Sequence, residues 1–325
     1  MFLASVMAID VEGFCSMANH LHLIVRNRPD VAAKWSPEQV ARKWLQLCPP
    51  YKPGTREVAE TPSQADLDAI LNNPGRVEQL RLRLSNPSWL MRFLTESLAR
   101  FANREDRTTG RFWEGRFKMQ RLLDEWAVAA CLVYVDLNPI RAGITTELSD
   151  SQHTSIFERL AGVVHAFGKT LTAQQRRDYG LEVDDAGGPT ILPDGSGEGQ
   201  SDSTPARPIG ANSLAKESPS DQQAVTEATQ PTAHPKQVDY RSLSQGTASE
   251  VNEVARQAAF AGRGSWLAPL EITEQALQQP VPGTRTSNLG CLNMTFTQYL
   301  QLLEWTGRQV AKGKVGQIQI GRAHV

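Results

Sequence analysis

The sequence predicts an α+β protein, and three features of its 325 residues indicate this class. Two apolar runs near the N-terminus, 11–17 and 20–25, are typical of β-strands. Several longer segments repeat apolar residues at helical spacing. Apolar residues make up 40% of the chain and charged residues 21%, which is typical of globular proteins that also carry some low-complexity sequence.

The first 25 residues predict a short helix followed by a β-hairpin. The helix is expected at 2–9, and Ala18 and Asn19 lie at the turn between the two strands. A two-stranded ribbon is only marginally stable by itself, so further strands are expected to pair with it. The chain starts abruptly within the predicted helix, which indicates that one strand precedes its first residue.

Four helices are expected after the hairpin. Ser36 as N-cap, Pro37 at the first helical position and Gln39 predict a helix over 36–47 that begins with a capping box. The other three follow from apolar spacing and are expected at 64–72, 76–84 and 87–105.

Residues 110–122, GRFWEGRFKMQRL, alternate in a way that predicts a strand, in which Gly115 permits a bulge or a close backbone approach. Ten arginines and one lysine oppose five acidic residues between Arg76 and Arg121, a local net charge of +6. Cations beside aromatic rings suit single-stranded DNA, because phosphates and bases are bound together. The candidate DNA contacts in this strand are Arg111, Phe112, Arg116, Lys118 and Arg121.

The cysteines and the lack of targeting segments predict a cytoplasmic protein. Cys15, Cys48, Cys131 and Cys291 are widely spaced and form no CxxC pair, so reduced thiols are expected in place of disulfides or a zinc site. No run approaches the roughly 18 apolar residues of a membrane span. The N-terminus lacks the basic start and cleavage site of a signal peptide.

The later part of the chain changes composition several times. Residues 1–160 are expected to form the main domain and 161–182 a helical extension. Gly, Pro, Ser, Asp and Thr dominate 183–238, which predicts a disordered linker. Order is expected to return in a C-terminal helical region, 239–319. The final residues 320–325, IGRAHV, read like a translated sequencing adapter and are expected to be an artefact.

His20 and His22 are two residues apart in a predicted strand, so both imidazoles project from one face. Each ring needs a hydrogen-bond partner and disfavours protonation of its neighbour, and a divalent metal relieves both difficulties. A solvated strand face or a hydrogen-bonded pair between strands explains the same spacing without a metal.

A predicted helix beginning at the N-cap Asp124 and ending near Pro139 carries two further polar candidates. Tyr134 and Asn138 are four residues apart and share one face if the helix persists that far. They offer a phenol nucleophile and a carbonyl oxygen for a metal. A core aromatic residue and a helix-end cap are the alternative interpretations.

MANHLHLIV, followed by GRFWEGRFK and then YVDLNPIRAG, resembles the IS200-like single-tyrosine transposases, in the REP-associated branch of the HUH endonucleases. The similarity covers roughly 1–160, within which the helical segment from about 36 to 84 resembles an insertion seen in longer members of the family. It implies that His20, His22 and Asn138 bind Mg²⁺ or Mn²⁺ and that Tyr134 attacks DNA to form a 5′-phosphotyrosine. Arg141 in the same element is added to the expected DNA contacts.

The resemblance also implies a ferredoxin- or RRM-like antiparallel sheet with helices on one face, single-stranded or hairpin DNA as substrate, and a homodimer. This chain lacks the family's opening strand and most of the helix that follows it. Two other interpretations remain. A metal-dependent hydrolase would need further histidine ligands, and a relative that binds hairpin DNA without cutting it would need none of this chemistry.

Overall fold

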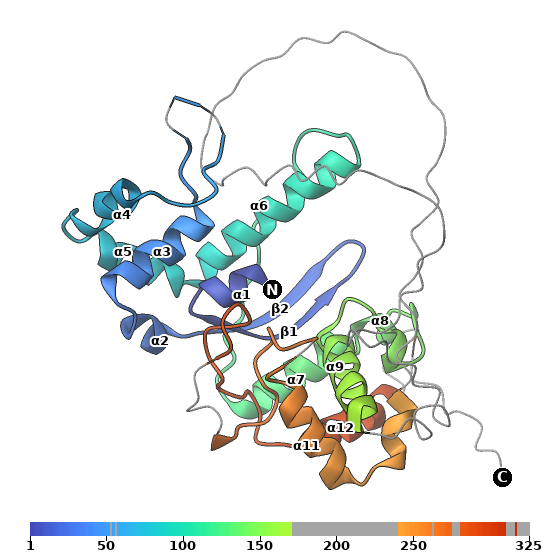
Figure 1. Ribbon diagram of the computed structural model, residues 1–325. Coiled ribbons are helices and arrows are strands. Elements are labelled where there is room, and N and C mark those ends of the chain that lie inside the picture. Colours follow the sequence, from blue (N-terminus) through green and yellow to red (C-terminus); the bar gives the residue numbers. More distant parts are fainter. Residues whose placement is uncertain are drawn as a thin grey trace, which may run out of the picture.

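The computed structural model describes residues 1–52, 54–55, 57–170, 240–261, 263–274, 280–309 and 316. The predicted linker and the six terminal residues lie outside the described residues. Figure 1 shows the elements, which are α1 (Phe2–Val6), β1 (Ile9–Ser16), β2 (Leu21–Asn27), α2 (Pro29–Ala33), α3 (Pro37–Leu47), α4 (Gln64–Leu71), α5 (Arg76–Leu84), α6 (Pro87–Glu105), α7 (Glu125–Asp136), α8 (Asn138–Arg141), η1 (Leu148–Asp150), α9 (Ser155–Thr170), η2 (Tyr240–Gln245), α11 (Ala248–Ala258) and α12 (Phe296–Arg308).

The chain is a mixed α+β protein built around an antiparallel hairpin of β1 and β2. Cys15 pairs with His22, and the register shifts between Val11 and Gly13, which marks a bulge. Within the described part of the chain the sheet has these two strands. Figure 1 shows the hairpin between two groups of helices, α3 to α6 on one side and α7, α9, α11 and α12 on the other.

The first group of helices forms a core of its own with α1 and the base of the hairpin. The predicted capping box of α3 is confirmed: Ser36 Oγ accepts from Gln39 N at 3.1 Å, and Ser36 N donates to Gln39 Oε1 at 2.8 Å. Leu23 and Val25 of β2 pack against this core. Its buried residues include Val40, Trp44, Leu80, Leu84, Leu90 and Phe93.

The second core joins α7 to elements that lie far along the chain. Its buried residues include Leu132, Ile140, Ile156, Leu160, Val251, Tyr299 and Leu303. The C-terminal elements η2, α11 and α12 therefore pack in the same core as α7 and α9. The boundary expected at residue 160, between the main domain and the helical extension, falls inside α9, which is continuous from Ser155 to Thr170.

A buried ionic network fastens the base of the hairpin to the segment before α12. Asp10 is buried, and its Oδ2 accepts hydrogen bonds from Arg26, at 2.9 Å from Nη2, and from Arg28, at 3.2 Å from Nη1. Arg26 also donates to the carbonyl oxygens of Leu289 and Gly290. Buried carboxylates depend on such partners, because an unpaired charge in the interior is costly.

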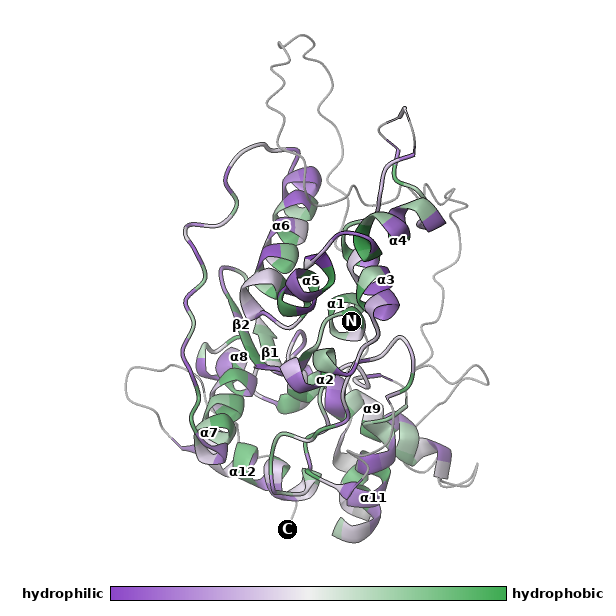
Figure 2. Cartoon of the chain, turned by 90° about the vertical axis from the view of Figure 1, so that its left-hand side faces the viewer, coloured by the Kyte–Doolittle hydropathy of each residue, from purple (hydrophilic) through white to green (hydrophobic). Residues whose placement is uncertain are grey.

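The prediction of a strand at 110–122 is wrong. The segment is irregular and mostly exposed, and Figure 2 shows it running along the outside of the molecule from α6 to α7. Trp113 is the anchored residue, since its Nε1 donates to Thr95 O on α6 at 2.8 Å. Gly115 approaches no other part of the protein, because a Cβ added there would meet nothing within 4 Å. Alternation in the sequence thus gives an extended path without a neighbouring strand to pair with.

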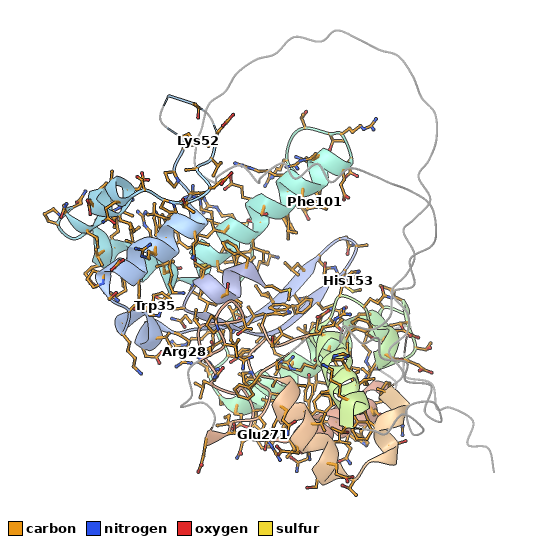
Figure 3. The ribbon with its side chains drawn as sticks, viewed as in Figure 1. Arg28, Trp35, Lys52, Phe101, His153 and Glu271 are labelled. Atoms are coloured by element: carbon orange, nitrogen blue, oxygen red, sulfur yellow. The ribbon has the colours of Figure 1, made fainter. Side chains whose placement is uncertain are left out.

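The second half of α6 projects beyond the core. Leu90 and Phe93 are buried as the apolar spacing predicts, whereas Leu98 and Phe101 are 38% and 56% exposed. Figure 3 labels Phe101 on this outer part of the helix. All four cysteines are free thiols. No helix among the described residues combines the length and apolar character needed to cross a membrane.

Candidate active site

The hairpin places both histidines at the end where β2 begins. His20 lies in the turn, and its carbonyl oxygen accepts from Met17 N at 2.9 Å, which closes the turn before β2. His22 follows in β2 and is half-buried. Their ring centroids are 4.9 Å apart with an interplanar angle of 78°. The two imidazoles are therefore side by side, as the spacing predicts.

The turn also orients the ring of His20. A hydrogen bond of 2.7 Å joins His20 Nδ1 to Asn19 Oδ1. Because an amide oxygen can only accept, Nδ1 carries the proton in this arrangement, and Nε2 keeps its lone pair. A carbonyl group behind a histidine is a common means of fixing the tautomer that binds a metal.

Gly13 allows α7 to lie close against the hairpin. A Cβ at this position would stand 2.5 Å from Leu132 Cδ2 and 3.2 Å from Ser155 Oγ. Leu132 belongs to α7 and is fully buried. The absence of a side chain in the β1 bulge thus sets the separation between the strand and the helix.

This close packing brings Tyr134 of α7 to His22. Their ring centroids are 5.5 Å apart and the rings meet edge to face, at 79°. Tyr134 is 52% exposed, and its hydroxyl has no hydrogen-bond partner among the described residues. The alternative interpretation of Tyr134 as a core aromatic residue is therefore wrong, because the core lies on the opposite side of α7.

Asn138 begins α8, one helical turn beyond Tyr134. α7 ends at Asp136 and the helical path resumes after Leu137, which suits the missing N–H of Pro139. Asn138 is buried, and its Nδ2 has no hydrogen-bond partner among the described residues. A buried donor without a partner costs about 1–3 kcal/mol. The site around Asn138 thus has an unsatisfied polar position.

These donors suit a divalent metal with retained waters. Rotating the Asn138 amide by half a turn exchanges its nitrogen and oxygen, and the oxygen would then occupy the unpartnered position. Two imidazoles and one amide oxygen form a mixed set that Mn²⁺ accepts readily and Mg²⁺ less so. No three His, Cys, Asp or Glu side chains in the described ranges gather into a metal site. The candidate set therefore depends on the asparagine.

The charge state of His22 favours ligation near neutral pH. Burial lowers the pKa of His22 below its ordinary value of 6.5, and the neighbouring His20 lowers it further. Across the hairpin, burial raises the pKa of the Cys15 thiol to about 11, so Cys15 stays protonated and offers no thiolate. The imidazole is the available ligand at this end of the strands.

We expect Mn²⁺ binding to persist down to pH 6.5 and to weaken only at lower pH. A lowered pKa means that protons displace the metal from His22 in a more acidic range than from an ordinary histidine. Electron paramagnetic resonance of free Mn²⁺ during a pH titration measures this. His22→Asn should abolish binding, while His153→Asn, outside the site, should preserve it. Release of Mn²⁺ well above pH 6.5 would contradict the expected state of His22.

The candidate DNA contacts fall into two groups. Arg116, Lys118 and Arg121 are exposed on the irregular segment after α6, and Phe112 is 45% exposed beside them. Arg111 is also exposed, although its Nε donates to Trp113 O at 2.8 Å. These five side chains are accessible to a polyanion.

Arg141 differs from these five because its guanidinium group is already bound. Nη1 donates to Gln309 O and Nη2 to Thr306 O, both at 2.5 Å. These carbonyl groups end α12, where the helix dipole favours a cation. In this structure Arg141 fastens α8 to α12, and the motif alone does not reveal this role because its partner is 165 residues away.

A groove of about 450 Å³ beside Tyr134 was not predicted from the sequence. Its residues come from α7, α8 and α12 and are Trp126, Ala129, Ala130, Val133, Tyr134, Leu137, Arg141, Leu302 and Thr306. Trp126 is 79% exposed and lies two helical turns before Tyr134. The spacing of eight residues between two aromatic side chains on one helix was the available signal. An exposed indole that lines the same groove as the phenol offers a flat surface to a base.

No protein-family model, curated protein sequence or solved structure matches the chain. The interpretation of the site therefore depends on its own geometry. The structure brings together the imidazoles of His20 and His22 and the exposed phenol of Tyr134, where β2 packs against α7, and the unpartnered amide of Asn138 follows one helical turn after Tyr134.

Proposed function

We propose that the chain is a metal-dependent enzyme that cleaves and rejoins single-stranded DNA through Tyr134, similar to IS200-like and REP-associated tyrosine transposases. The single observation that carries the proposal is the 5.5 Å separation between the Tyr134 and His22 rings, with His20 beside them. These residues come from segments more than a hundred positions apart. An exposed phenol without a hydrogen-bond partner, next to two metal-binding side chains, suits a nucleophile better than a structural residue.

The fold is compatible with the proposal at the level of one hairpin and one helix. In a ferredoxin- or RRM-like sheet, antiparallel strands carry helices on one face; here α7 packs against one side of the hairpin, and α3 to α6 cover the other side. In the described region only β1 pairs with β2, so the other edge of β2 has no strand partner there. A homodimer remains part of the proposal and would bring two copies of the site to one DNA molecule.

The proposed reaction exchanges one phosphate ester for another. The phenolic oxygen of Tyr134 forms a bond to phosphorus, the bond from phosphorus to the 3′ oxygen breaks, and the proton lost by the phenol is balanced by the one gained by the 3′-hydroxyl. A bound Mg²⁺ or Mn²⁺ would supply Lewis-acid polarisation of the phosphate and offset the developing negative charge. His20, His22 and Asn138 would hold it. The ester energy is retained, so rejoining needs no nucleotide cofactor.

We expect Tyr134→Phe to abolish a covalent protein–DNA adduct that wild-type protein forms with a suicide single-stranded oligonucleotide and Mn²⁺. The substitution removes only the nucleophilic oxygen and keeps the ring against His22. A denaturing gel with labelled DNA measures the adduct. Tyr51→Phe is the matched control, because Tyr51 is also exposed, at 40%, and lies outside the site. An adduct that survives Tyr134→Phe, or that Tyr51→Phe removes, would assign the nucleophile elsewhere.

A second candidate is a protein that binds hairpin DNA without cutting it. The exposed basic and aromatic segment from 107 to 124 favours this function, since its cations and rings are available whether or not a metal is bound. Retarded migration of a DNA hairpin without any adduct, in the presence of Mn²⁺, would support the binder over the enzyme.

A further inference from the structure

Two arginines, Arg83 of α5 and Arg92 of α6, lie over tryptophan rings away from the site described above. The guanidinium carbon of Arg83 lies 4.6 Å from the ring centroid of Trp89 and 5.5 Å from that of Trp44. The guanidinium carbon of Arg92 lies 5.0 Å from the centroid of Trp89. Arg76 is close enough to oppose the charge of Arg83. We call Arg76, Arg83 and Arg92 the arginine cluster.

The indole rings hold these cations in fixed positions. Trp44 is buried, and its ring meets that of Trp89 edge to face, with centroids 5.5 Å apart. Stacking on an indole restricts a guanidinium group but leaves its N–H donors free at the edge of the plane. The long arginine side chains are therefore ordered before any anion arrives, which reduces the entropy lost on binding.

The positive charge of the arginine cluster is not neutralised within the described structure. No carboxylate there forms an ion pair with Arg83 or Arg92, and Arg76 donates only to Gln79 Oε1, at 2.6 Å. The nearby Glu96 pairs with Arg100 instead. Burial lowers the pKa of Arg83, and repulsion from Arg76 and Arg92 adds to this. Like charges held together in this way favour a bound anion.

We propose that the arginine cluster binds backbone phosphates of DNA, at a second contact surface separate from the His20–His22–Tyr134 site. The choice of DNA as the polyanion rests on the proposed function. A guanidinium fork matches the geometry of phosphate oxygens, and several phosphates along one strand match several cations. The cluster belongs to the stretch from Arg76 to Arg121, which has a net charge of +6. A single carboxylate of a partner protein would not neutralise this charge, whereas a strand of DNA carries many phosphates.

The test measures binding of the full chain to DNA without cleavage. Protein carrying Tyr134→Phe is titrated, in EDTA, into a fluorescent DNA hairpin with a single-stranded extension, and anisotropy is recorded over a range of salt concentrations. We expect Arg92→Gln, and separately Arg83→Gln, to lower the slope of log affinity against log salt by about 0.9, for one lost phosphate contact. If the variant and the unsubstituted protein bind equally at 1 M salt, this change of slope makes binding of the variant about eightfold weaker at 0.1 M salt.

Arg42→Gln is the matched control. It removes the same charge from the same insertion, but Arg42 is exposed on α3 and pairs with Glu38 at 2.7 Å. Arg83 packs on two rings, so thermal unfolding checks that its variant is folded; Arg92 is exposed and tests the cluster without this complication. The inference is overturned if Arg92→Gln and folded Arg83→Gln change the slope no more than Arg42→Gln does.

Two other outcomes separate the alternatives. Equal, cluster-dependent binding of polyglutamate of matched length would identify a surface for acidic proteins and overturn the assignment to DNA. If the wild-type protein forms no covalent adduct with DNA, the proposed enzyme activity is wrong. A salt dependence of DNA binding that changes in the Arg83 and Arg92 variants would still support the second contact surface. The two proposals can therefore fail separately.

Discussion

Asp136→Ala is expected to lower the free energy of unfolding by roughly 3–5 kcal/mol. Asp136 is fully buried on α7, and its carboxylate accepts from Ser155 Oγ at 2.5 Å, from Ile156 N at 2.9 Å and from Tyr299 Oη at 2.6 Å. Alanine leaves Ile156 N and Tyr299 Oη inside the protein without this acceptor, and Ser155 Oγ retains only its long hydrogen bond of 3.4 Å to Phe14 O. Urea unfolding followed by circular dichroism measures the change.

Two conservative variants separate the parts of this network. Tyr299→Phe removes a single donor and should cost about 1 kcal/mol. Asp136→Asn keeps the size of the side chain but presents an N–H toward a donor, so it should fall between the other two. If Asp136→Ala were no more destabilising than Tyr299→Phe, the carboxylate would not join α7, α9 and α12 as we infer.

Gly13→Val is expected to destabilise the fold by about 1–3 kcal/mol and to separate Tyr134 from His22. The new side chain would enter the space of Leu132, which is fully buried, and protein interiors are closely packed. α7 must then shift away from β1. In the folded protein, nuclear Overhauser contacts between the Tyr134 and His22 rings should weaken, and the yield of covalent adduct should fall with them.

Gly115→Val is the matched control for this prediction, because a side chain at 115 points into open space. It should leave the stability of the fold and the contacts between the Tyr134 and His22 rings unchanged. Retention of the contacts between His22 and Tyr134 in Gly13→Val would show that the bulge does not determine the position of α7.

The features predictable from the sequence depend on local chemistry. The hairpin follows from apolar strands around a turn, and the Ser36 capping box and the Asp124 N-cap follow from short-range hydrogen bonds. The proximity of His20 to His22 also follows, since residues i and i+2 share a face of a strand.

The features that sequence reasoning missed depend on distant partners. Residues 110–122 have strand-like alternation, but alternation cannot supply a neighbouring strand, and the segment is left irregular. Arg141 appears available for DNA until the carbonyl groups that end α12 are known. The arginine cluster depends on the packing of α3, α5 and α6, which places Arg83 and Arg92 on shared rings.

The hydrogen bond from Tyr299 to Asp136 has a consequence for how the protein is made. Residues 1–170 leave the ribosome well before Tyr299 is translated, so α7 emerges with a carboxylate whose last donor does not yet exist. The helix that carries Tyr134 therefore reaches its final packing only after α12 has been made, so a chain that stops before α12 lacks one donor to the buried carboxylate of Asp136.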